Sequence, residues 1–335
     1  MTPEGVIVPM FTPCTEEGQL DPEGIQGYVQ YLESRAGISY IFVRSGVGRM
    51  YTFTCDETRL MMKEALSASA SKPILPGTAG EYDGNPEAKP LAEEYTQQTI
   101  ELSQEAHALG APAVVIVLPS ALPLKRRDSS EDVIFEYYKQ IDEAVDIPIL
   151  LYQPPGLPEP FQMTSPLMRR LSELDHVIGM KLSSADSSLW QELGSTARET
   201  GFSMICGNEN GYLMALFHGA QGVIGEGCNL YPELLCALKY HFEMGDLDTA
   251  EVLQEKIQRM LGLKKKFPSS LIGKALAKYR GYNVQVALRP DPRKKQTGYD
   301  SKSDPAQSLP DEAFIAKYDE ELRKACEPYL NIVVQ

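Results

Sequence analysis

The chain has 335 residues, of which 43% are hydrophobic and 23% are charged, and Gly and Pro occur at near-average frequency. This length suits one large barrel or two mid-sized domains, and the composition excludes disordered, collagen-like and coiled-coil proteins. Because 46 acidic residues outnumber 32 basic ones, the net charge of −14 repels phosphate backbones and anionic lipid, so we expect neither a nucleic-acid nor a membrane partner.

The six cysteines are scattered along the chain, without a CxxC pair or a short spacing to histidine. This pattern predicts neither a metal site nor a disulfide framework, and we expect a reduced, cytoplasmic protein. The N-terminus has no basic and apolar leader. The uncharged stretch of membrane-spanning length, residues 106–124, is interrupted by glycine and prolines.

Eight short runs rich in β-branched residues recur along the chain, each followed by a polar loop and a segment of helical period. The runs are residues 5–10, 39–44, 73–78, 113–118, 147–152, 177–181, 202–206 and 222–226. Helix starts are indicated by Asp21, Asp56, Ser130 and Ser165, and helix ends by Gly110 and Gly201. Such alternation predicts parallel strands joined by helices, and a TIM (β/α)8 barrel fits best. An open doubly wound sheet is the alternative.

Three helical patterns follow the eighth run, at residues 232–244, 246–263 and 269–279. The polar stretch 289–310 is typical of an irregular excursion or linker. The last amphipathic segment, 311–329, is expected to pack on the body through Phe314, Ile315, Tyr318 and Leu322. We therefore divide the chain into a barrel (1–228), C-terminal helices packed on it (229–288), and an irregular segment with a terminal helix (289–335).

Polar residues that close the strands are the candidate site residues, because the carboxyl ends of barrel strands converge on one mouth. They are Arg44, Arg49, Glu81, Tyr152, Lys181, Asn208, Glu209, Asn210 and Glu226.

Lys181 follows Val177-Ile178-Gly179-Met180, so its amine is expected in an apolar barrel interior, where burial favours the neutral, nucleophilic form. A neutral amine attacks a ketone to form an imine, which permits cleavage or formation of a neighbouring C–C bond. Tyr152 lies one βα unit earlier and can transfer a proton at the same mouth. A solvated lysine and a packing tyrosine are the ordinary alternatives, and the pair favours the catalytic interpretation.

Six motifs in order carry a family resemblance. They are Met10-Phe11-Thr12-Pro13 with Gly18-x-x-Asp21, Ile149-Leu150-Leu151-Tyr152-Gln153-x-Pro155, Ile178-Gly179-Met180-Lys181, Gly207-Asn208-Glu209, Gly219-Ala220-Gln221-Gly222-Val223-Ile224, and Asn229-x-x-Pro232. From Gly5 to about Tyr282 the chain resembles the dihydrodipicolinate synthase and N-acetylneuraminate lyase family of Schiff-base aldolases. The resemblance implies a (β/α)8 barrel with a C-terminal helical extension, Lys181 as imine-forming lysine, Tyr152 as proton shuttle, no external cofactor, and a homodimer or homotetramer.

The chain departs from the family at several positions. The carboxylate-binding loop aligns to Ser45-Gly46-Val47-Gly48-Arg49, which lacks both hydroxyl side chains of the family motif but keeps its backbone amides, and Arg49 or Arg44 could supply a charged donor. The tyrosine pair of the synthases falls at Ser120-Ala121, and their entrance arginine at Leu157. These differences argue against dihydrodipicolinate synthase activity itself.

The substrate-binding residues implied by the resemblance are Gly46, Val47, Gly48, Arg49, Arg44, Glu209, Asn210, Ile224 and Glu226. Glu209, Asn210 and Glu226 align with residues that touch the sugar chain in sialic-acid lyases, which suits a polyhydroxylated or amine-bearing substrate; solvated loop acids are the alternative. Two functions follow: an imine-forming aldolase or hydro-lyase for a sugar-related 2-oxo acid, or a non-catalytic small-ligand-binding descendant of the same barrel. Retention of Lys181 and Tyr152 favours the first.

Overall fold

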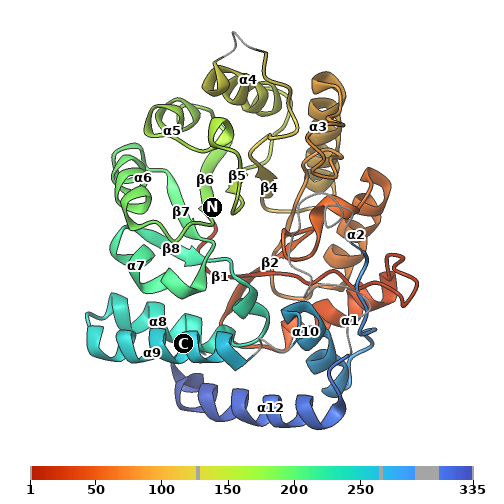
Figure 1. Cartoon of the computed structure of the whole chain (residues 1–335), viewed down its shortest axis with the longest axis vertical. Helices are drawn as coiled ribbons and strands as arrows, with labels where there is room; N and C mark the ends of the chain where they lie inside the picture. The colour runs from red at the N-terminus through yellow and green to blue at the C-terminus, as the bar shows by residue number, and fades with distance from the viewer. Residues whose placement is uncertain (1, 126–128, 264–266, 291–308, 334–335) are drawn as a thin grey trace.

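The computed structural model describes residues 2–125, 129–263, 267–290 and 309–333. Eight parallel strands alternate with helices and lie at the centre of a ring of helices (Figure 1). The strands are β1 (Gly5–Pro9), β2 (Ile38–Val43), β3 (Ile74–Pro76), β4 (Val114–Val117), β5 (Ile149–Gln153), β6 (Val177–Leu182), β7 (Ser203–Cys206) and β8 (Ala220–Val223). Seven of the eight predicted runs agree with these strands to within two residues at each end.

The sheet closes on itself, which confirms the barrel and excludes the open doubly wound alternative. The strand order is β3-β2-β1-β8-β7-β6-β5-β4, so β3 and β4 form the two ends. A parallel bridge pairs Gly77 with Val115 across this seam, and the Thr78 N–H donates to the Val115 carbonyl at 3.1 Å. Closure brings the carboxyl ends of all eight strands to one mouth.

The end of the eighth strand was predicted wrongly. β8 stops at Val223, and Glu226 begins the short 3-10 helix η4 (Glu226–Asn229) instead of closing a strand. The Gly225 N–H donates to Cys228 Sγ at 3.3 Å, and the Gly227 N–H donates to Glu209 Oε1 at 2.8 Å. These bonds occupy the amides that a longer strand would pair with its neighbours, and they turn the chain away from the sheet.

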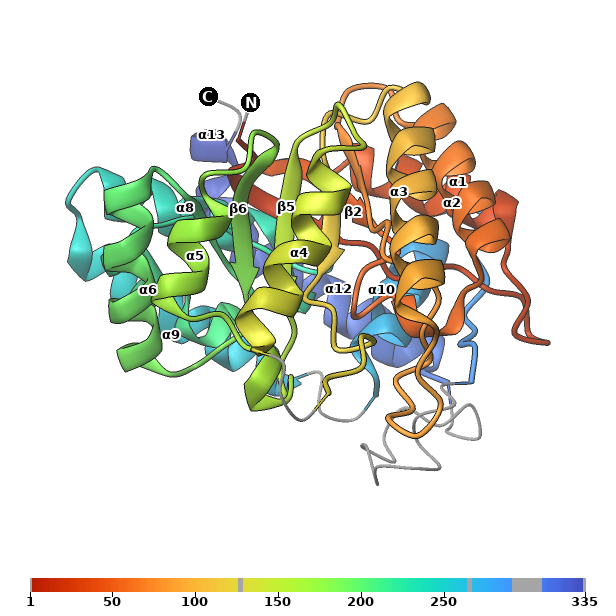
Figure 2. The same cartoon turned by 90° about the horizontal axis from the view of Figure 1, so that it is seen from above.

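The helices around the barrel are α1 (Pro22–Glu33), α2 (Cys55–Ala68), α3 (Ala92–Ala108), α4 (Ser130–Asp142), α5 (Ser165–Leu171), α6 (Ser187–Thr200), α7 (Tyr212–Phe217) and α8 (Pro232–Glu243). Figure 2 shows β5 and β6 from the side, flanked by α4, α5 and α6. Asp21 caps α1 as predicted, but α2 begins earlier than expected from Asp56. Thr54 is its N-cap, because Thr54 and Glu57 form a reciprocal capping box.

Alternate side chains of each strand face two separate apolar layers. Those that face outward, such as Val8, Ile41 and Ile116, pack against the helices. Those that face inward form the barrel interior, with Ile7, Phe42, Leu75, Val115, Leu150, Tyr152, Ile205 and Ile224 among them. The interior is thus a packed core, and a charged side chain placed in it is removed from water.

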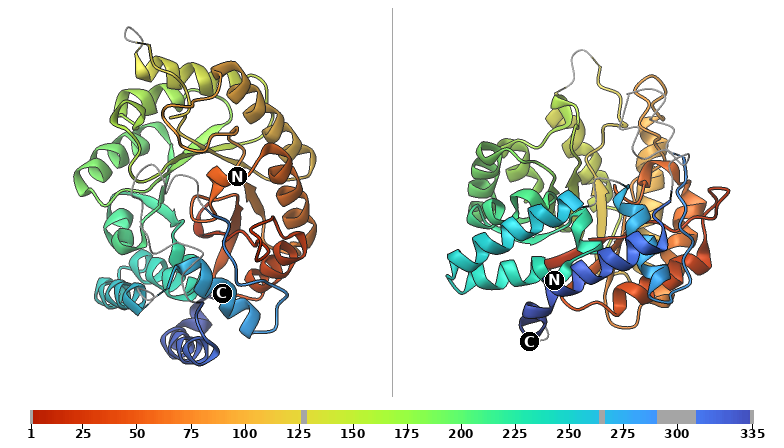
Figure 3. Two further views of the ribbon diagram at one scale, coloured as in Figure 1. Left: turned by 45° about the vertical axis from the view of Figure 1, so that its right-hand side comes forward. Right: turned by 60° about the horizontal axis from the view of Figure 1, so that its bottom comes forward.

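The C-terminal extension consists of α9 (Leu247–Leu263), α10 (Ser269–Tyr279), α12 (Glu312–Cys326) and α13 (Leu330–Val333). Figure 3 shows α12 on the outside of the helix ring, beside α10 and α8. Ile315, Tyr318 and Leu322 are buried in this contact, as the predicted amphipathic face requires. Most of the predicted excursion, residues 291–308, lies outside the described residues. No described helix has the length and hydropathy that a membrane crossing requires.

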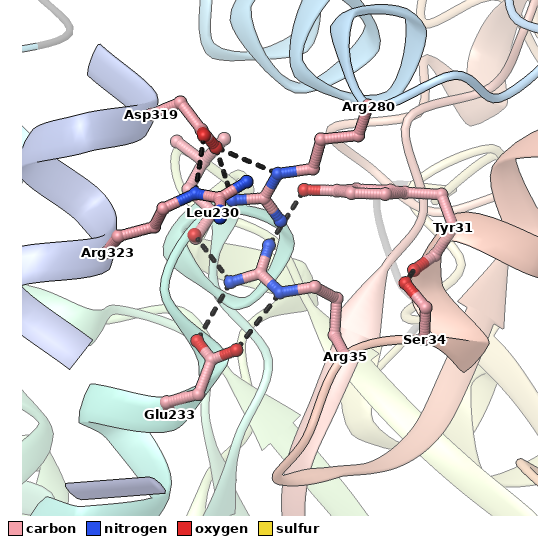
Figure 4. Close-up of polar contacts among 8 residues, drawn as sticks. All are labelled: Tyr31, Ser34, Arg35, Leu230, Glu233, Arg280, Asp319 and Arg323. Atoms are coloured by element: carbon pink, nitrogen blue, oxygen red, sulfur yellow. Dashed lines mark hydrogen bonds and ion pairs between the residues drawn. The ribbon is translucent and has the colours of Figure 1, made fainter. Parts of the chain in front are cut away.

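Charged groups join α1 to α8 and the end of α10 to α12 (Figure 4). The Arg35 guanidinium at the end of α1 makes a bidentate pair with Glu233 of α8, at 2.8 and 3.0 Å, and also donates to the Leu230 carbonyl at 3.1 Å. Asp319 of α12 accepts from Arg280, at 2.5 Å, and from Arg323, at 2.7 Å. Arg35 and Glu233 are nearly inaccessible to water, so each charge depends on its partner.

Candidate active site

Lys181 and Tyr152 lie side by side at the mouth of the barrel. They occupy paired positions on β6 and β5, and the period of two along each strand turns both side chains inward. The Lys181 Nζ lies 4.1 Å from the centre of the Tyr152 ring and 5.8 Å from that of Phe42. Both residues are buried. The structure therefore brings together the amine and the phenol that the sequence selects.

The surroundings of Lys181 lower the pKa of its ammonium below that of a solvated lysine. Burial among apolar side chains lowers the pKa of the ammonium to about 8, although the nearby Cys228 thiol and Glu209 carboxylate act in the opposite direction. No carboxylate among the described residues forms an ion pair with this nitrogen. With a pKa of about 8, about one tenth of this amine is neutral at pH 7, far more than for a solvated lysine.

The loop after β2 supplies backbone donors beside Tyr152. Ser45 Oγ organises this loop, since it accepts from the Gly48 N–H at 3.0 Å and donates to the Met10 carbonyl at 3.1 Å. No hydrogen bond within the described chain uses the N–H groups of Gly46 and Val47. A Cβ built on Gly46 would lie 2.7 Å from the Tyr152 hydroxyl, so the phenol rests directly on this loop. Two amides are thus available to an acceptor next to the phenol.

Arg44 lies in the same region, but its side chain is turned toward the loop after β3. Its backbone is left-handed, with φ of 52°, which is uncommon for a side-chain-bearing residue. The buried guanidinium donates to the carbonyls of Gly77, Ala79, Phe53 and Gly80. Its Nε–H is buried and has no partner among the described residues.

A small cavity of about 20 Å³, partly open to solvent, adjoins Tyr152 on the side of β2, β3 and β4. It is lined by Phe42, Arg44, Met50, Tyr51, Gly77, Ala79, Gly80, Tyr82, Tyr95, Val117 and Tyr152. No acidic side chain contributes to this lining. The walls are therefore largely aromatic, and a single guanidinium supplies the charge.

Arg49 does not lie in that cavity. It also has a left-handed backbone, with φ of 65°, and its guanidinium donates to the Arg289 carbonyl. It lines a second, smaller cavity, of about 10 Å³, together with Thr12, Lys274 and Arg289. Lys274 is a second buried lysine, and burial lowers its pKa to about 8. Its Nζ donates to the Ala287 carbonyl at 2.7 Å.

The acids expected to bind a sugar chain have protein partners. Glu209 is buried, and its carboxylate accepts from the Gly227 N–H. Glu226 accepts from Ser269 Oγ at 2.6 Å, and Asn210 is exposed on the short helix η3 (Glu209–Gly211). Ile224 is buried in the barrel interior near Tyr152. None of these four side chains lines the cavity beside Tyr152.

Sequence reasoning missed the aromatic walls of this cavity and the burial of Lys274. It searched for polar residues that close strands, whereas Tyr51 and Tyr82 lie several residues beyond β2 and β3. Aromatic residues in the loops that follow consecutive strands were the available signal. Lys274 gave none, because a lysine within an amphipathic helix is ordinarily solvated.

A closed eight-stranded barrel, with a buried lysine and tyrosine paired at its mouth, defines a protein of the TIM-barrel class. The sequence profile of the Dihydrodipicolinate synthetase family matches residues 2–305. The chain belongs to this family of lyases, as the resemblance in its motifs predicted.

Curated relatives agree with this assignment. The chain is 30% identical over 292 residues to an uncharacterized DapA-like lyase of Pyrococcus abyssi, with 86% of this chain and 91% of that protein covered. It is 26% identical over 258 residues to the 4-hydroxy-tetrahydrodipicolinate synthase of Nitrosospira multiformis, with 77% and 79% covered.

Solved structures share the fold. The sialic acid aldolase of Ruminococcus gnavus superposes with a TM-score of 0.77 at 19% identity, covering 97% of this chain and 99% of that one. N-acetylneuraminate lyase from Mycoplasma synoviae gives a TM-score of 0.74 at 19% identity, covering 96% and 97%. At an identity of 19%, this similarity shows that the fold is shared.

Proposed function

We propose that the protein is a Schiff-base lyase that acts on a 2-oxo acid through an imine at Lys181, with Tyr152 as the proton shuttle. The observation that supports this most is the pairing of a buried amine with a phenol ring whose centre lies 4.1 Å from its nitrogen. Burial lowers the pKa of that amine to about 8. Membership of a lyase family supports the same reaction class.

In the proposed reaction the neutral Lys181 amine attacks the C2 carbonyl of the oxo acid. The carbinolamine oxygen takes up protons and leaves as water, and the C=N bond forms. Loss of a C3 proton then gives an enamine, whose C3 can attack an aldehyde to form a C–C bond. The new alkoxide takes a proton from the Tyr152 hydroxyl, and hydrolysis of the product imine restores the amine. Cleavage follows these steps in reverse.

The carboxylate of the oxo acid is proposed to bind the free N–H groups of Gly46 and Val47. These amides lie on the loop that touches the Tyr152 hydroxyl, so a carboxylate bound there is close to the reacting carbonyl. Arg49 is less suitable than the sequence suggested, because its guanidinium donates to the Arg289 carbonyl beside the second cavity. Backbone donors thereby replace the missing loop hydroxyls.

The sugar-like substrate expected from the sequence depended on Glu209, Asn210 and Glu226. Both carboxylates have protein partners, and none of the three side chains lines the cavity beside Tyr152. We therefore propose a 2-oxo acid as the donor without a sugar chain. The non-catalytic alternative gains no support from the geometry, since a purely binding protein has no need of a buried lysine.

Exchange of the methyl protons of pyruvate with D₂O, followed by NMR, tests this function without knowledge of the aldehyde. Enamine formation requires loss of a C3 proton, so the wild type is expected to exchange these protons far faster than buffer does. Lys181→Arg keeps the charge and removes the nucleophile, and should abolish the exchange. Lys274→Arg is the matched control, since it alters the other buried lysine and should retain the exchange. Binding of pyruvate without exchange in the wild type would support the non-catalytic alternative.

A further inference from the structure

Arg289 lies in the segment that follows α10, and its guanidinium binds groups from three distant parts of the chain. Its Nε–H donates to the Gly18 carbonyl, on the loop after β1, at 2.7 Å, and an Nη–H donates to the Thr52 carbonyl, after β2, at 2.9 Å. Its two Nη atoms also bind the Glu57 carboxylate of α2, at 2.8 and 2.5 Å. The guanidinium carbon lies over the Phe53 ring, 4.3 Å from its centre. One side chain of the C-terminal extension therefore joins two loops of the barrel mouth to the start of α2.

The Arg289 carbonyl contacts the turn that follows β2. It accepts from the Arg49 guanidinium, and the Arg49 N–H donates to the Gly46 carbonyl at 3.0 Å. The Arg49 backbone is left-handed, with φ of 65°, a conformation that is unfavourable for a residue with a side chain and persists where neighbouring contacts hold it. Arg289 supplies such a contact, so it helps to maintain the turn from Gly46 to Arg49.

This turn carries the groups on which the proposed reaction depends. The N–H groups of Gly46 and Val47 are the proposed carboxylate donors, and no hydrogen bond within the described chain uses them. A Cβ on Gly46 would lie 2.7 Å from the Tyr152 hydroxyl, so the phenol rests on the same turn. A shift of the turn would therefore change where the carboxylate of an oxo acid lies relative to Tyr152 and Lys181.

The partners of Arg289 belong to fixed parts of the fold. Glu57 is the N3 residue of α2 and forms a capping box with Thr54, so the helix fixes the position of its carboxylate. The hydrogen bond from Arg289 lowers the pKa of that carboxyl and so favours the ionised partner. The Arg289 and Glu57 side chains are only 13% and 26% exposed, and salt screens such a pair less than a surface pair. Two residues earlier, the Ala287 carbonyl accepts from the buried Lys274, which holds the same segment to α10.

We propose that Arg289 is a positioning residue of the active site, which holds the Gly46–Arg49 turn where its amides can bind the carboxylate of the substrate. The guanidinium anchors the C-terminal segment, and the carbonyl of the same residue holds Arg49. The proposal rests on the proposed function and adds that the C-terminal extension takes part in substrate binding. Arg289 acts through Arg49 and is assigned no contact with the substrate.

Loss of this anchor should raise KM more than it lowers kcat. Without the guanidinium the turn populates other positions, and the apparent affinity for pyruvate falls with the fraction of chains in which the turn is in place. At saturating pyruvate the bound carboxylate restores that position, so kcat is largely recovered. A ketone without a carboxylate does not use the amides, so its reaction should depend little on the turn.

Proton exchange with D₂O, followed by NMR, measures these quantities in Arg289→Met. We expect KM for pyruvate to rise by about 10-fold or more, kcat to fall by less than about threefold, and kcat/KM for acetone to fall by less than about twofold. Arg280→Met is the matched control, because Arg280 is also in the extension, is 18% exposed and pairs with Asp319, but lies over Tyr31 near the end of α1. It should leave all three values within about twofold of the wild type. An unchanged KM for pyruvate in a folded Arg289→Met protein, an equal loss with acetone, or an equal rise in Arg280→Met would overturn the proposal.

Two milder variants decide the proposal if Arg289→Met does not fold. Arg289→Lys keeps the charge but presents one nitrogen in place of three. Glu57→Gln removes the partner charge but keeps an oxygen for the capping bond from the Thr54 N–H. Each should raise KM for pyruvate by about threefold or more, with kcat/KM for acetone nearly unchanged. Exchange with an unchanged KM in both variants would overturn this proposal alone, whereas absence of exchange in the wild type would overturn the proposed function with it.

Discussion

The hydroxyl oxygen of Tyr152 occupies the space that a side chain at position 46 would need, since a Cβ on Gly46 would lie 2.7 Å from it. Contacts this short between Cβ and oxygen do not persist, so one of the two groups would have to move. The absence of a side chain at Gly46 thus fixes where the phenol stands relative to the loop amides and to Lys181.

Gly46→Ala should therefore displace the phenol and lower kcat for pyruvate proton exchange by about 10-fold or more, the scale for a misplaced catalytic group. The backbone of Gly46 is not left-handed, so the substitution should not strain the loop itself. In a Tyr152→Phe background, which lacks the clashing oxygen, the same substitution should have little further effect. Additive losses in this double-mutant cycle would contradict the contact.

Tyr152→Phe removes only the hydroxyl and should lower kcat by about 10²- to 10⁴-fold, the usual size of general acid–base assistance. Stability should change by only about 1 kcal/mol, because the ring continues to pack against Phe42. Tyr138→Phe is the matched control, since this buried tyrosine donates to the Ile116 carbonyl on the outer side of the sheet. It should show a similar change in Tm with full activity. Equal activities of the two variants would assign Tyr152 to packing.

Lys181→Met should stabilise the protein at neutral pH, because it removes a buried ammonium. The folded pKa of about 8 lies below the ordinary value of 10.5. Below about pH 8 both folded and unfolded chains bind the proton, and the wild type bears the full desolvation penalty, about 1 to 3 kcal/mol. Between pH 8 and 10.5 the unfolded chain binds more protons, so the penalty declines as pH rises. Denaturant unfolding of both proteins at pH 7 and pH 10 should show the advantage of methionine shrinking, whereas a constant difference would argue against a lowered pKa.

Glu233→Gln should destabilise the fold by about 3 to 5 kcal/mol, because it leaves the Arg35 charge buried without its partner. Asp132→Asn is the control, since Asp132 pairs with Arg170 at the same 2.8 Å but on the surface. The control should cost less than about 1 kcal/mol. Chemical denaturation of the two variants measures both values, and equal losses would show that burial does not set the strength of the pair.

Much of the fold could be predicted from the sequence, because buried parallel strands lose hydrophobic alternation and recur at a regular interval. The errors lie where side chains decide local structure. Thr54 rather than Asp56 begins α2 through its bond to the Glu57 N–H, and Glu226 enters a 3-10 turn held by the bond from Gly227 to Glu209. The order of residues in the sequence does not tell which donor meets which acceptor in such bonds.

The same limit applies to the site. The period of two along β5 and β6 was sufficient to bring Tyr152 and Lys181 to one mouth. The direction of Arg49 was not predictable, because a left-handed backbone turns its side chain toward the Arg289 carbonyl, 240 positions away in the chain. The cavity walls combine loops after different strands, so their proximity depends on closure of the barrel.

The most direct test of the central claim is to locate the adduct formed when pyruvate and borohydride are added together. Reduction converts an imine into a stable secondary amine, and peptide mass spectrometry then identifies the modified lysine. The account predicts one adduct per chain, on Lys181, that forms faster as pH rises toward 8 and is absent from Lys181→Arg. An adduct that persists in Lys181→Arg, or one carried by Lys274 instead, would contradict it.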